Sequence, residues 1–374
     1  MKVLITGADG FIAKTLRIRV NELPEHRVVM FTRNNRVGEL PALLDGVDAV
    51  IHLAGVNRPD TEGEFTTGNA ELTQALCNAI ALKTNKPIVI LASSTQAAQD
   101  NAYGRSKFAA EQAVRELANR HAVHTFIYRL PNVFGKWCKP NYNSVVATFC
   151  HNISQNLPIQ INDASKELSL VYVDDVVDAF LEIISKQDHT ERNNSNTIEQ
   201  AVQPKYTIAL GDLANQIQAF KDSRTTGITE AVGTGLTRAL YSTYISYLKP
   251  QQFSYTLTKH ADPRGEFVEM LKTQEAGQFS YFTAFPGITR GGHYHHTKTE
   301  KFLVIRGEAR FKFRHIVTDE CFEQITSGDN PTIVETIPGW THDITNIGET
   351  EMIVMLWANE IFDRKKPDTI NSPL

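Results

Sequence analysis

Residues 1–13 read MKVLITGADGFIA, and this stretch decides the fold of the first part of the chain. The run KVLIT is apolar and partly β-branched, which predicts a buried strand. Gly7 and Gly10 follow directly in a G-x-x-G-x-x-A turn, and a helical pattern begins at Phe11. Glycines in such a turn let the backbone approach a pyrophosphate, which the free N–H groups of the helix attract. The stretch therefore predicts a strand, a turn and a helix that bind a dinucleotide.

The same alternation continues to about residue 245. Helical patterns begin at Phe11 and Tyr103 and cover residues 69–83, and between them lie apolar runs: KVLIT, RVVMFT, DAVIHLAG, PIVILAS and a run ending at Leu130. Strands that alternate with helices form βαβ units, in which the strands are parallel. The fold class predicted for this part is α/β, a Rossmann-like, doubly wound parallel sheet with helices on both faces.

After about residue 250 the pattern changes. The segments QFSYFTAFPG, EKFLVIRGEARFKFRH and EMIVMLWAN have strand-like alternation interrupted by Gly and Pro. This predicts a small all-β barrel or sandwich. The chain has 374 residues, too many for one typical core, so we expect two domains, residues 1–247 and 248–374. The aromatic segment LYSTYISYLKPQQ at residues 240–252 is predicted to be the hinge between them.

Composition excludes several functions. The formal charge of −4 is spread along the chain without a dense Lys/Arg run, which argues against nucleic acid or an anionic membrane as a partner. We expect neither a leader nor a membrane span, because MKVLITGADGF has no basic region before a long apolar run and no later stretch has about 18 apolar residues. The four cysteines form no C-x-x-C pair and are expected to be free thiols in a reducing compartment: Cys77, Cys138, Cys150 and Cys321. We expect a cytoplasmic protein.

The end of the second predicted strand indicates which dinucleotide binds. An NAD enzyme usually places an acidic residue there to bind the ribose 2′-hydroxyl. This chain has Phe31-Thr32-Arg33-Asn34 instead. The Arg33 guanidinium suits a 2′-phosphate, so NADPH is favoured over NADH.

A catalytic group is predicted on a later helix. Tyr103 and Lys107 form a Tyr-x-x-x-Lys pair whose side chains leave one face of the helix. An ammonium beside a phenol is expected to lower the phenol pKa, which makes the phenol a usable proton donor or acceptor. Ser94, at the end of PIVILASS, is placed to bind the same substrate carbonyl oxygen.

These motifs together resemble the extended short-chain dehydrogenase/reductase family. The match rests on TGADGFIA, HLAG at 52–55, SS at 93–94, YGRSK at 103–107, RLPNVFG at 129–135 and YVDDVV at 172–177. The resemblance implies that Tyr103 is the catalytic acid, that Lys107 orients the nicotinamide ribose and that Ser94 polarises the carbonyl. It also implies a substrate contact for Asn132. The cofactor-binding residues would be Gly7, Asp9, Gly10, Phe11, Ile12, Arg33, Leu53, Ala54, Gly55, Tyr103 and Lys107.

The chain departs from the family pattern after Ser94. Thr95-Gln96 stands where related dehydratases carry an Asp-Glu pair, and the segment between Ser94 and Tyr103 is short. We therefore predict a simple carbonyl reductase and not a 4,6-dehydratase.

A second candidate site lies in GITRGGHYHHTKTEKFLVIRG, residues 287–307. Residues two apart on a strand share a face, so His293 and His295 are expected to point the same way. Glu300 follows a turn and can return to the same centre, and His342 in PGWTHDITN supplies a fourth group. Three imidazoles and one carboxylate suit a divalent transition metal, with zinc favoured.

These two segments resemble the signature motifs of the cupin superfamily, which implies a jelly-roll barrel. DPRGEFVE at 262–269 and RGGHY at 290–294 also resemble the deoxythymidine-diphosphate-sugar 3,5-epimerases. That second resemblance implies that Arg264 contacts the nucleotide diphosphate and that His293 is the catalytic base. His293 is therefore either a metal ligand or a base, and both roles stay open.

The order of the two modules resembles bifunctional enzymes of capsular polysaccharide and O-antigen synthesis. A C4 ketone acidifies the C3 hydrogen of a hexose, and its reduction removes that activation. The resemblance implies C3 epimerisation of UDP-2-acetamido-2,6-dideoxy-β-L-arabino-hexos-4-ulose by the cupin. NADPH-dependent C4 reduction to the L-talose sugar would follow, on the route to UDP-N-acetyl-L-fucosamine, in an enzyme that commonly forms homodimers. Two alternatives are a reductase with a structural cupin and a sensor of NADPH and a sugar without turnover.

Overall fold

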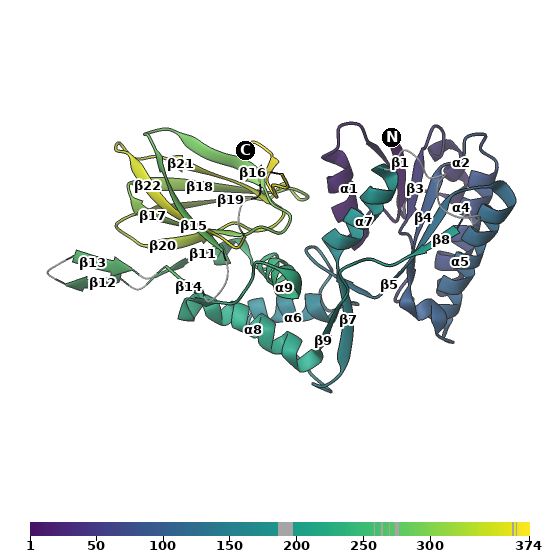
Figure 1. Cartoon of the computed structure of the whole chain (residues 1–374), viewed down its shortest axis with the longest axis horizontal. Helices are drawn as coiled ribbons and strands as arrows, with labels where there is room; N and C mark the ends of the chain where they lie inside the picture. Colours follow the sequence, from purple (N-terminus) through teal and green to yellow (C-terminus); the bar gives the residue numbers. More distant parts are fainter. Residues whose placement is uncertain are drawn as a thin grey trace. The chain divides into compact units, whose positions relative to one another are not determined.

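The computed structural model describes every residue except 186–196, 258, 263–264, 269, 274–276, 361–362 and 364. The chain forms two compact units (Figure 1). Met1–Lys139 and Leu168–Thr207 make the first, and Pro140–Glu167 and Ile208–Leu374 make the second. The division into modules at residue 247 stays a prediction.

The first unit is built on a six-stranded parallel sheet. Its order is β2-β1-β3-β4-β5-β8, with bounds Arg27–Phe31, Lys2–Thr6, Ala49–His52, Ile88–Ser94, Thr125–Leu130 and Thr197–Gln200. The chain leaves β1 for β2 on one side and later returns to β3 on the other. The carboxyl ends of β1 and β3 therefore border the crevice in which doubly wound sheets bind ligands. The predicted Rossmann-like fold is confirmed.

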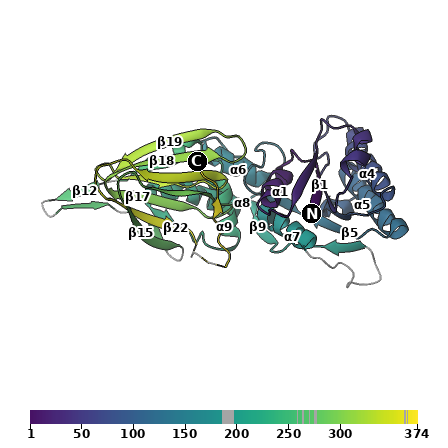
Figure 2. The same cartoon turned by 90° about the horizontal axis from the view of Figure 1, so that it is seen from above.

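Helices cover both faces of this sheet. Figures 1 and 2 show α1 (Phe11–Asn21) and α7 (Val173–Ser185) on one face, and α4 (Leu72–Ala81) and α5 (Ala102–His121) on the other. The short helices α2 (Leu40–Leu43) and α3 (Gly63–Phe65) and a π-helical turn, Thr66–Glu71, lie on the α4 and α5 side or lead into it. A small sheet joins β6, β7 and β9, with bounds Asn132–Phe134, Glu167–Tyr172 and Tyr206–Ala209.

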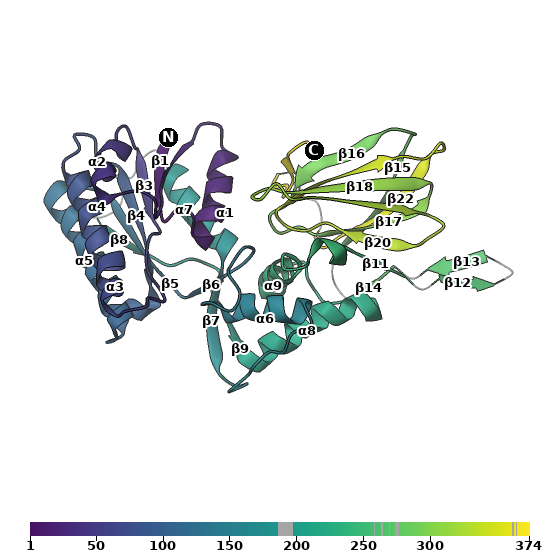
Figure 3. The same cartoon turned by 180° about the vertical axis from the view of Figure 1, so that it is seen from behind.

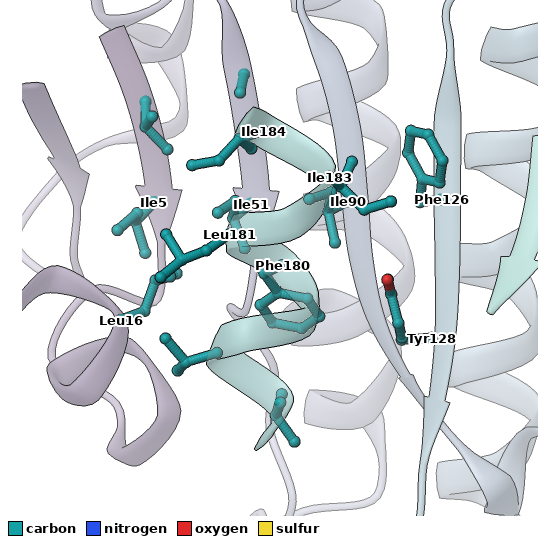
Figure 4. Packing of buried hydrophobic residues seen from close by; sticks show 14 of the residues in the cluster. Ile5, Leu16, Ile51, Ile90, Phe126, Tyr128, Phe180, Leu181, Ile183 and Ile184 are labelled. Carbon is teal, nitrogen blue, oxygen red and sulfur yellow. The ribbon is translucent and has the colours of Figure 1, made fainter. Parts of the chain in front are cut away.

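The apolar core under α7 shows why this helix forms. Its apolar residues recur at helical spacing, and Phe180, Leu181, Ile183 and Ile184 turn toward the sheet (Figure 4). They meet side chains of the strands, among them Ile51 and Tyr128, whose ring centroid is 5.1 Å from that of Phe180. Burying one such side chain contributes about 1.5–3 kcal/mol, so this face fixes the helix on the sheet.

The second unit contains two five-stranded sheets that face each other (Figure 3). One has the order β11-β20-β17-β22-β15, with bounds Ser254–Thr256, Thr332–Glu335, Glu300–Arg306, Met352–Ala358 and Gln278–Ala284. The other has the order β19-β18-β21-β16-β23, with bounds Cys321–Ser327, Glu308–His315, Trp340–Asn346, Thr289–Tyr294 and Ile370–Asn371. Phe302 and Phe311 meet between the sheets with ring centroids 5.7 Å apart. The predicted all-β, cupin-like domain is confirmed.

Three helices accompany these sheets in the second unit: α6 (Val145–Ser154), α8 (Leu210–Thr226) and α9 (Gly235–Ile245). Two short strand pairs complete it, β10 (Ile228–Thr229) with β14 (Lys272–Thr273), and β12 (Lys259–Asp262) with β13 (Gly265–Val268). The segment predicted to be a hinge, residues 240–252, lies within the second unit, and its first six residues are buried in α9, so it does not link the two units. Tyr241 and Tyr244 pack edge-on or tilted against Phe220 of α8.

No helix among the described residues combines the length and the apolar character that a membrane span needs.

Candidate active site and metal centre

The glycine turn after β1 is held tightly against the end of β3. Gly7 has φ +64°, and a Cβ atom there would lie 2.7 Å from the Ala54 backbone. Only glycine fits this approach without a shift of the backbone. The N-cap of α1 is Gly10, which offers no side chain to the first helical N–H groups. These groups therefore suit an anionic ligand such as a pyrophosphate.

A chain of hydrogen bonds under this turn orders the loop at Leu53–Gly55. Thr6 Oγ1 accepts the amides of Leu53 and Ala54, each at 3.2 Å, and lies 2.6 Å from His52 Nδ1. His52 Nε2 lies 2.8 Å from Thr73 Oγ1. Since the Thr73 hydroxyl donates to the Asn69 carbonyl, the imidazole donates through Nε2 and accepts the Thr6 hydroxyl at Nδ1.

His52 is neutral in this position. Complete burial, and to a smaller extent the Lys107 charge, lower the pKa of His52 to about 3. The HLAG motif at residues 52–55 marks this loop but does not by itself reveal the role of His52. The sequence feature that could have identified His52 is a polar residue at the last position of an otherwise apolar strand.

The predicted catalytic serine and tyrosine are brought together. Ser94 ends β4, and Tyr103 lies in the first turn of α5, where Asn101 Oδ1 accepts the Gly104 amide at 2.7 Å. Burial raises the pKa of Tyr103, and a hydrogen bond from Ser94 only partly opposes this rise. The phenol is therefore protonated at neutral pH, as a general acid must be.

Lys107 is anchored on β4. Its Nζ donates to the Ala92 carbonyl at 2.7 Å. Burial lowers the pKa of Lys107 to about 8, although Glu111 acts in the opposite direction. The expectation that Lys107 lowers the Tyr103 pKa is wrong for this structure, because burial of the phenol raises that pKa.

Other predicted cofactor and substrate residues lie near the ends of the strands. Arg33 is exposed in the turn after β2, and Asp9 lies 3.8 Å from Arg17 in an exposed ion pair. Asn132 begins β6 and donates to the Ser169 carbonyl at 3.2 Å. Their functional roles stay predictions. Arg264 lies outside the described residues.

The four predicted metal ligands converge. One nitrogen or oxygen atom from each of His293, His295, Glu300 and His342 lies within 4.8 Å of the others. His293 is on β16 and His295 just beyond it, Glu300 begins β17, and His342 is on β21. His293 is partly exposed, whereas the other three side chains are buried.

Proton positions in this cluster favour a cation at its centre. His295 Nδ1 lies 2.5 Å from the Asp368 carbonyl oxygen, which can only accept, so Nδ1 carries the proton. Nε2 is the His295 atom left to bind a metal, and it faces Glu300 Oε2 at 3.2 Å. Neither ring nitrogen of His342 has a clear hydrogen-bond partner among the described residues, and its Nε2 is 3.5 Å from Glu300.

The electrostatics of the cluster agree with this interpretation. Burial lowers the pKa of His293 to about 3, with further lowering from His342 and His295. Burial alone would raise the pKa of Glu300, but His295 and other neighbours hold it well below its usual range. Neutral imidazole and ionised carboxylate are the forms that bind a metal. The residues therefore fit a divalent cation.

Comparisons with known proteins agree with this arrangement. The NAD dependent epimerase/dehydratase family matches residues 3–198, and the polysaccharide biosynthesis C-terminal domain matches residues 260–370. A UDP-2-acetamido-2,6-β-L-arabino-hexul-4-ose reductase of Pseudomonas aeruginosa is 55% identical over 369 residues, which cover 99% of this chain and 98% of the relative.

Solved structures extend the match. The capsular polysaccharide assembling protein CapF of Staphylococcus aureus is 40% identical with a TM-score of 0.67, and all of both chains is covered. The UDP-glucuronic acid 4-epimerase of Bacillus cereus, solved with NAD, is 18% identical with a TM-score of 0.52. This match covers 59% of this chain and 84% of the epimerase chain, and it supports only the fold. The chain thus belongs to the NAD dependent epimerase/dehydratase family and, over its full length, to the two-module group that includes the Pseudomonas reductase and CapF.

Proposed function

We propose that this chain is a bifunctional nucleotide-sugar enzyme of capsule or O-antigen synthesis. Its substrate would be UDP-2-acetamido-2,6-dideoxy-β-L-arabino-hexos-4-ulose, a UDP-linked 4-keto-6-deoxy amino sugar. The cupin would invert C3, and the reductase would then convert the C4 ketone to UDP-2-acetamido-2,6-dideoxy-β-L-talose. The observation that carries the proposal is the pairing of Ser94 with a protonated Tyr103 at the cofactor end of the parallel sheet. The full-length likeness to a UDP-keto-sugar reductase supports it.

In the reductase site, this chain supplies orientation and one proton. Bound NADPH supplies the hydride for the C4 carbon. The Ser94 and Tyr103 hydroxyls bind the C4 oxygen, and Tyr103 donates its proton as negative charge develops there. The Lys107 ammonium would bind and orient the nicotinamide ribose.

The cofactor would be held by the glycine turn and the Leu53–Gly55 loop. Gly7, Gly10 and the first N–H groups of α1 suit the pyrophosphate. The exposed Arg33 guanidinium suits the 2′-phosphate, so NADPH is the proposed form. We also propose a homodimer.

In the cupin, His293, His295, Glu300 and His342 would hold a divalent metal, with zinc favoured. The bound cation supplies positive charge that can stabilise an enolate oxygen. His293 lies in the same group as the three other ligands, which supports its role as a ligand over its role as the base. Arg264 would contact the diphosphate.

One observation favours a second candidate for the cupin. His295, Glu300 and His342 are all less than a tenth exposed, and four protein ligands leave no open position on a tetrahedral ion. A structural metal in a non-epimerising cupin has these features. Under this alternative the chain is a reductase alone.

Two measurements on the full chain test these proposals. NADPH absorbance is followed with a panel of UDP- and dTDP-linked 4-keto-6-deoxy sugars, and the C3 configuration of the product is read by NMR. We expect oxidation with inversion at C3. Oxidation with retention would favour the structural cupin, and no oxidation with any sugar would contradict the reductase.

Exchange of the C3 hydrogen with deuterium, measured without NADPH, isolates the epimerase. Exchange by the wild-type chain supports an epimerase. Its absence, with reduction intact, supports a scaffold.

A further inference from the structure

We propose that residues 368–372 form a clasp that positions the ligands of the metal centre, with Asp368 as its principal positioning residue. The inference rests on the proposed metal site and adds residues that no motif assigns to it. The clasp is far in sequence from the metal-ligand residues that it contacts. Asp368 and His296, for example, are 72 residues apart.

The Asp368 carboxylate fixes the turn between two ligands. Its oxygens accept the backbone amides of His296 at 2.8 Å, Thr297 at 2.7 Å and Lys298 at 2.8 Å. The Thr297 hydroxyl donates to the same carboxylate at 3.0 Å. These three amides belong to the turn that links His295 to Glu300. Asp368 thus sets the path by which the glutamate returns to the histidines.

The Asp368 backbone acts on a ligand directly. Its carbonyl accepts the His295 Nδ1 proton, which leaves Nε2 as the metal-binding atom. A hydrogen bond on the far nitrogen of a ligating histidine fixes both its tautomer and its ring orientation. One residue therefore contacts the ligand turn through its side chain and a ligand ring through its main chain.

The residues after Asp368 pair with β16, the strand that carries His293. β23 pairs with β16, and Asn371 lies opposite His293. Beyond it the Ser372 amide donates to the Gly292 carbonyl at 2.7 Å, and the Thr341 hydroxyl contacts the Ser372 hydroxyl at 2.9 Å. Thr341 directly precedes His342 on β21. The clasp therefore contacts residues next to three of the four ligands and the His295 ring itself.

The probe is Co²⁺ added to the metal-free full chain, with affinity measured by chelator competition and coordination read from the visible spectrum. Asp368→Asn places an NH₂ group against backbone donors. We expect about a 10- to 100-fold loss of Co²⁺ affinity, as for other residues that orient metal ligands. The spectrum and the metal-induced rise in Tm should change as well, which a purely structural residue far from the ligands would not cause.

The matched control is Asp363→Asn. Asp363 is exposed in the same part of the chain, and among the described residues its carboxylate accepts the Lys365 amide, at 2.8 Å. It should bind Co²⁺ as the wild type does. If Asp368→Asn does not fold, Thr297→Val decides, because it removes one bond to the Asp368 carboxylate and should give a smaller loss in the same direction.

The outcomes separate the two proposals. A wild-type chain that binds no Co²⁺ and no Zn²⁺ overturns the metal centre. A wild-type chain that binds Co²⁺, with unchanged affinity and spectrum in Asp368→Asn, overturns the clasp and leaves the metal centre standing. If Asp368→Asn does not fold, unchanged Co²⁺ affinity and spectrum in Thr297→Val would likewise overturn the clasp.

Discussion

The tyrosine site of the first unit and the histidine cluster of the second are assembled in different ways. Ser94, Tyr103 and Lys107 lie within 14 consecutive residues, on one strand and the helix that follows it. The histidine cluster needs three strands and a turn fixed by a distant aspartate. A site built from one βα unit is specified locally, whereas a site between antiparallel strands depends on segments that meet only after folding.

The largest expected effect tests the independence of the two sites. Tyr103→Phe removes the proposed acid, so kcat for reduction should fall about 100- to 10,000-fold. Co²⁺ affinity and C3 exchange should not change, because the cluster shares no residue with this site. NADPH binding, measured by fluorescence titration, controls for folding. A normal rate of NADPH oxidation would remove Tyr103 from the mechanism.

The second effect is confined to the cluster. His342→Ala removes a proposed ligand, and its cost in Zn²⁺ affinity should exceed the roughly 100-fold expected for a residue that only orients a ligand. His121→Ala, at the end of α5, is the matched control. Reduction of a substrate that already has the inverted C3 should persist. Equal zinc content in both variants would contradict the ligand assignment.

The third expected effect is a loss of folding stability at acidic pH. The pKa of His52 is about 3 in the folded chain, below the usual value near 6.5. The unfolded chain therefore binds more protons between these pH values, and stability falls as the pH drops. His52 should contribute a loss of about 2 kcal/mol between pH 6.5 and pH 5.

Urea unfolding of the wild type and of His52→Gln at both pH values measures this contribution. Glutamine can hydrogen-bond to Thr6 and Thr73 but does not titrate, so the variant should lose less stability on acidification. An identical loss in both proteins would show that His52 does not cause the acid sensitivity.

The smallest effect tests cofactor choice at the edge of the first site. Arg33→Ser should lower the preference for NADPH over NADH about tenfold, the value of one hydrogen bond to a charged group. Arg36→Ser, an exposed neighbour in the same turn region, should leave the ratio unchanged. If the ratio of kcat/KM for NADPH to kcat/KM for NADH is the same in the wild type, Arg33→Ser and Arg36→Ser, Arg33 does not recognise the 2′-phosphate.

The contrast between the sites also explains what the sequence predicted. Gly7, Ser94 and Tyr103 stand at fixed positions relative to strand and helix ends, so their proximity follows from the topology of a parallel sheet. The four metal ligands lie in two recognisable motifs. Asp368 lies in neither, and its contact with His296 depends on a strand pairing that no local periodicity encodes.

Two other expectations from the sequence were wrong because they did not account for burial in the folded chain. Tyr241 and Tyr244 were expected in a hinge because Pro250 follows an aromatic segment, yet they pack inside the second unit. The pKa of Tyr103 was expected to fall because a lysine is close in sequence. Its desolvation, which depends on tertiary packing, outweighs that proximity.

The interleaved connectivity of the two units has a consequence for biosynthesis. The chain passes between them at residues 139–140, 167–168 and 207–208, so no single cut separates one intact unit from the other. During translation the first unit can be completed once residue 207 has emerged. Residues 140–167, already synthesised by then, must wait for α8 and α9, the helices that α6 packs against. A nascent chain therefore exposes α6 to solvent or chaperones until its remaining partners are made.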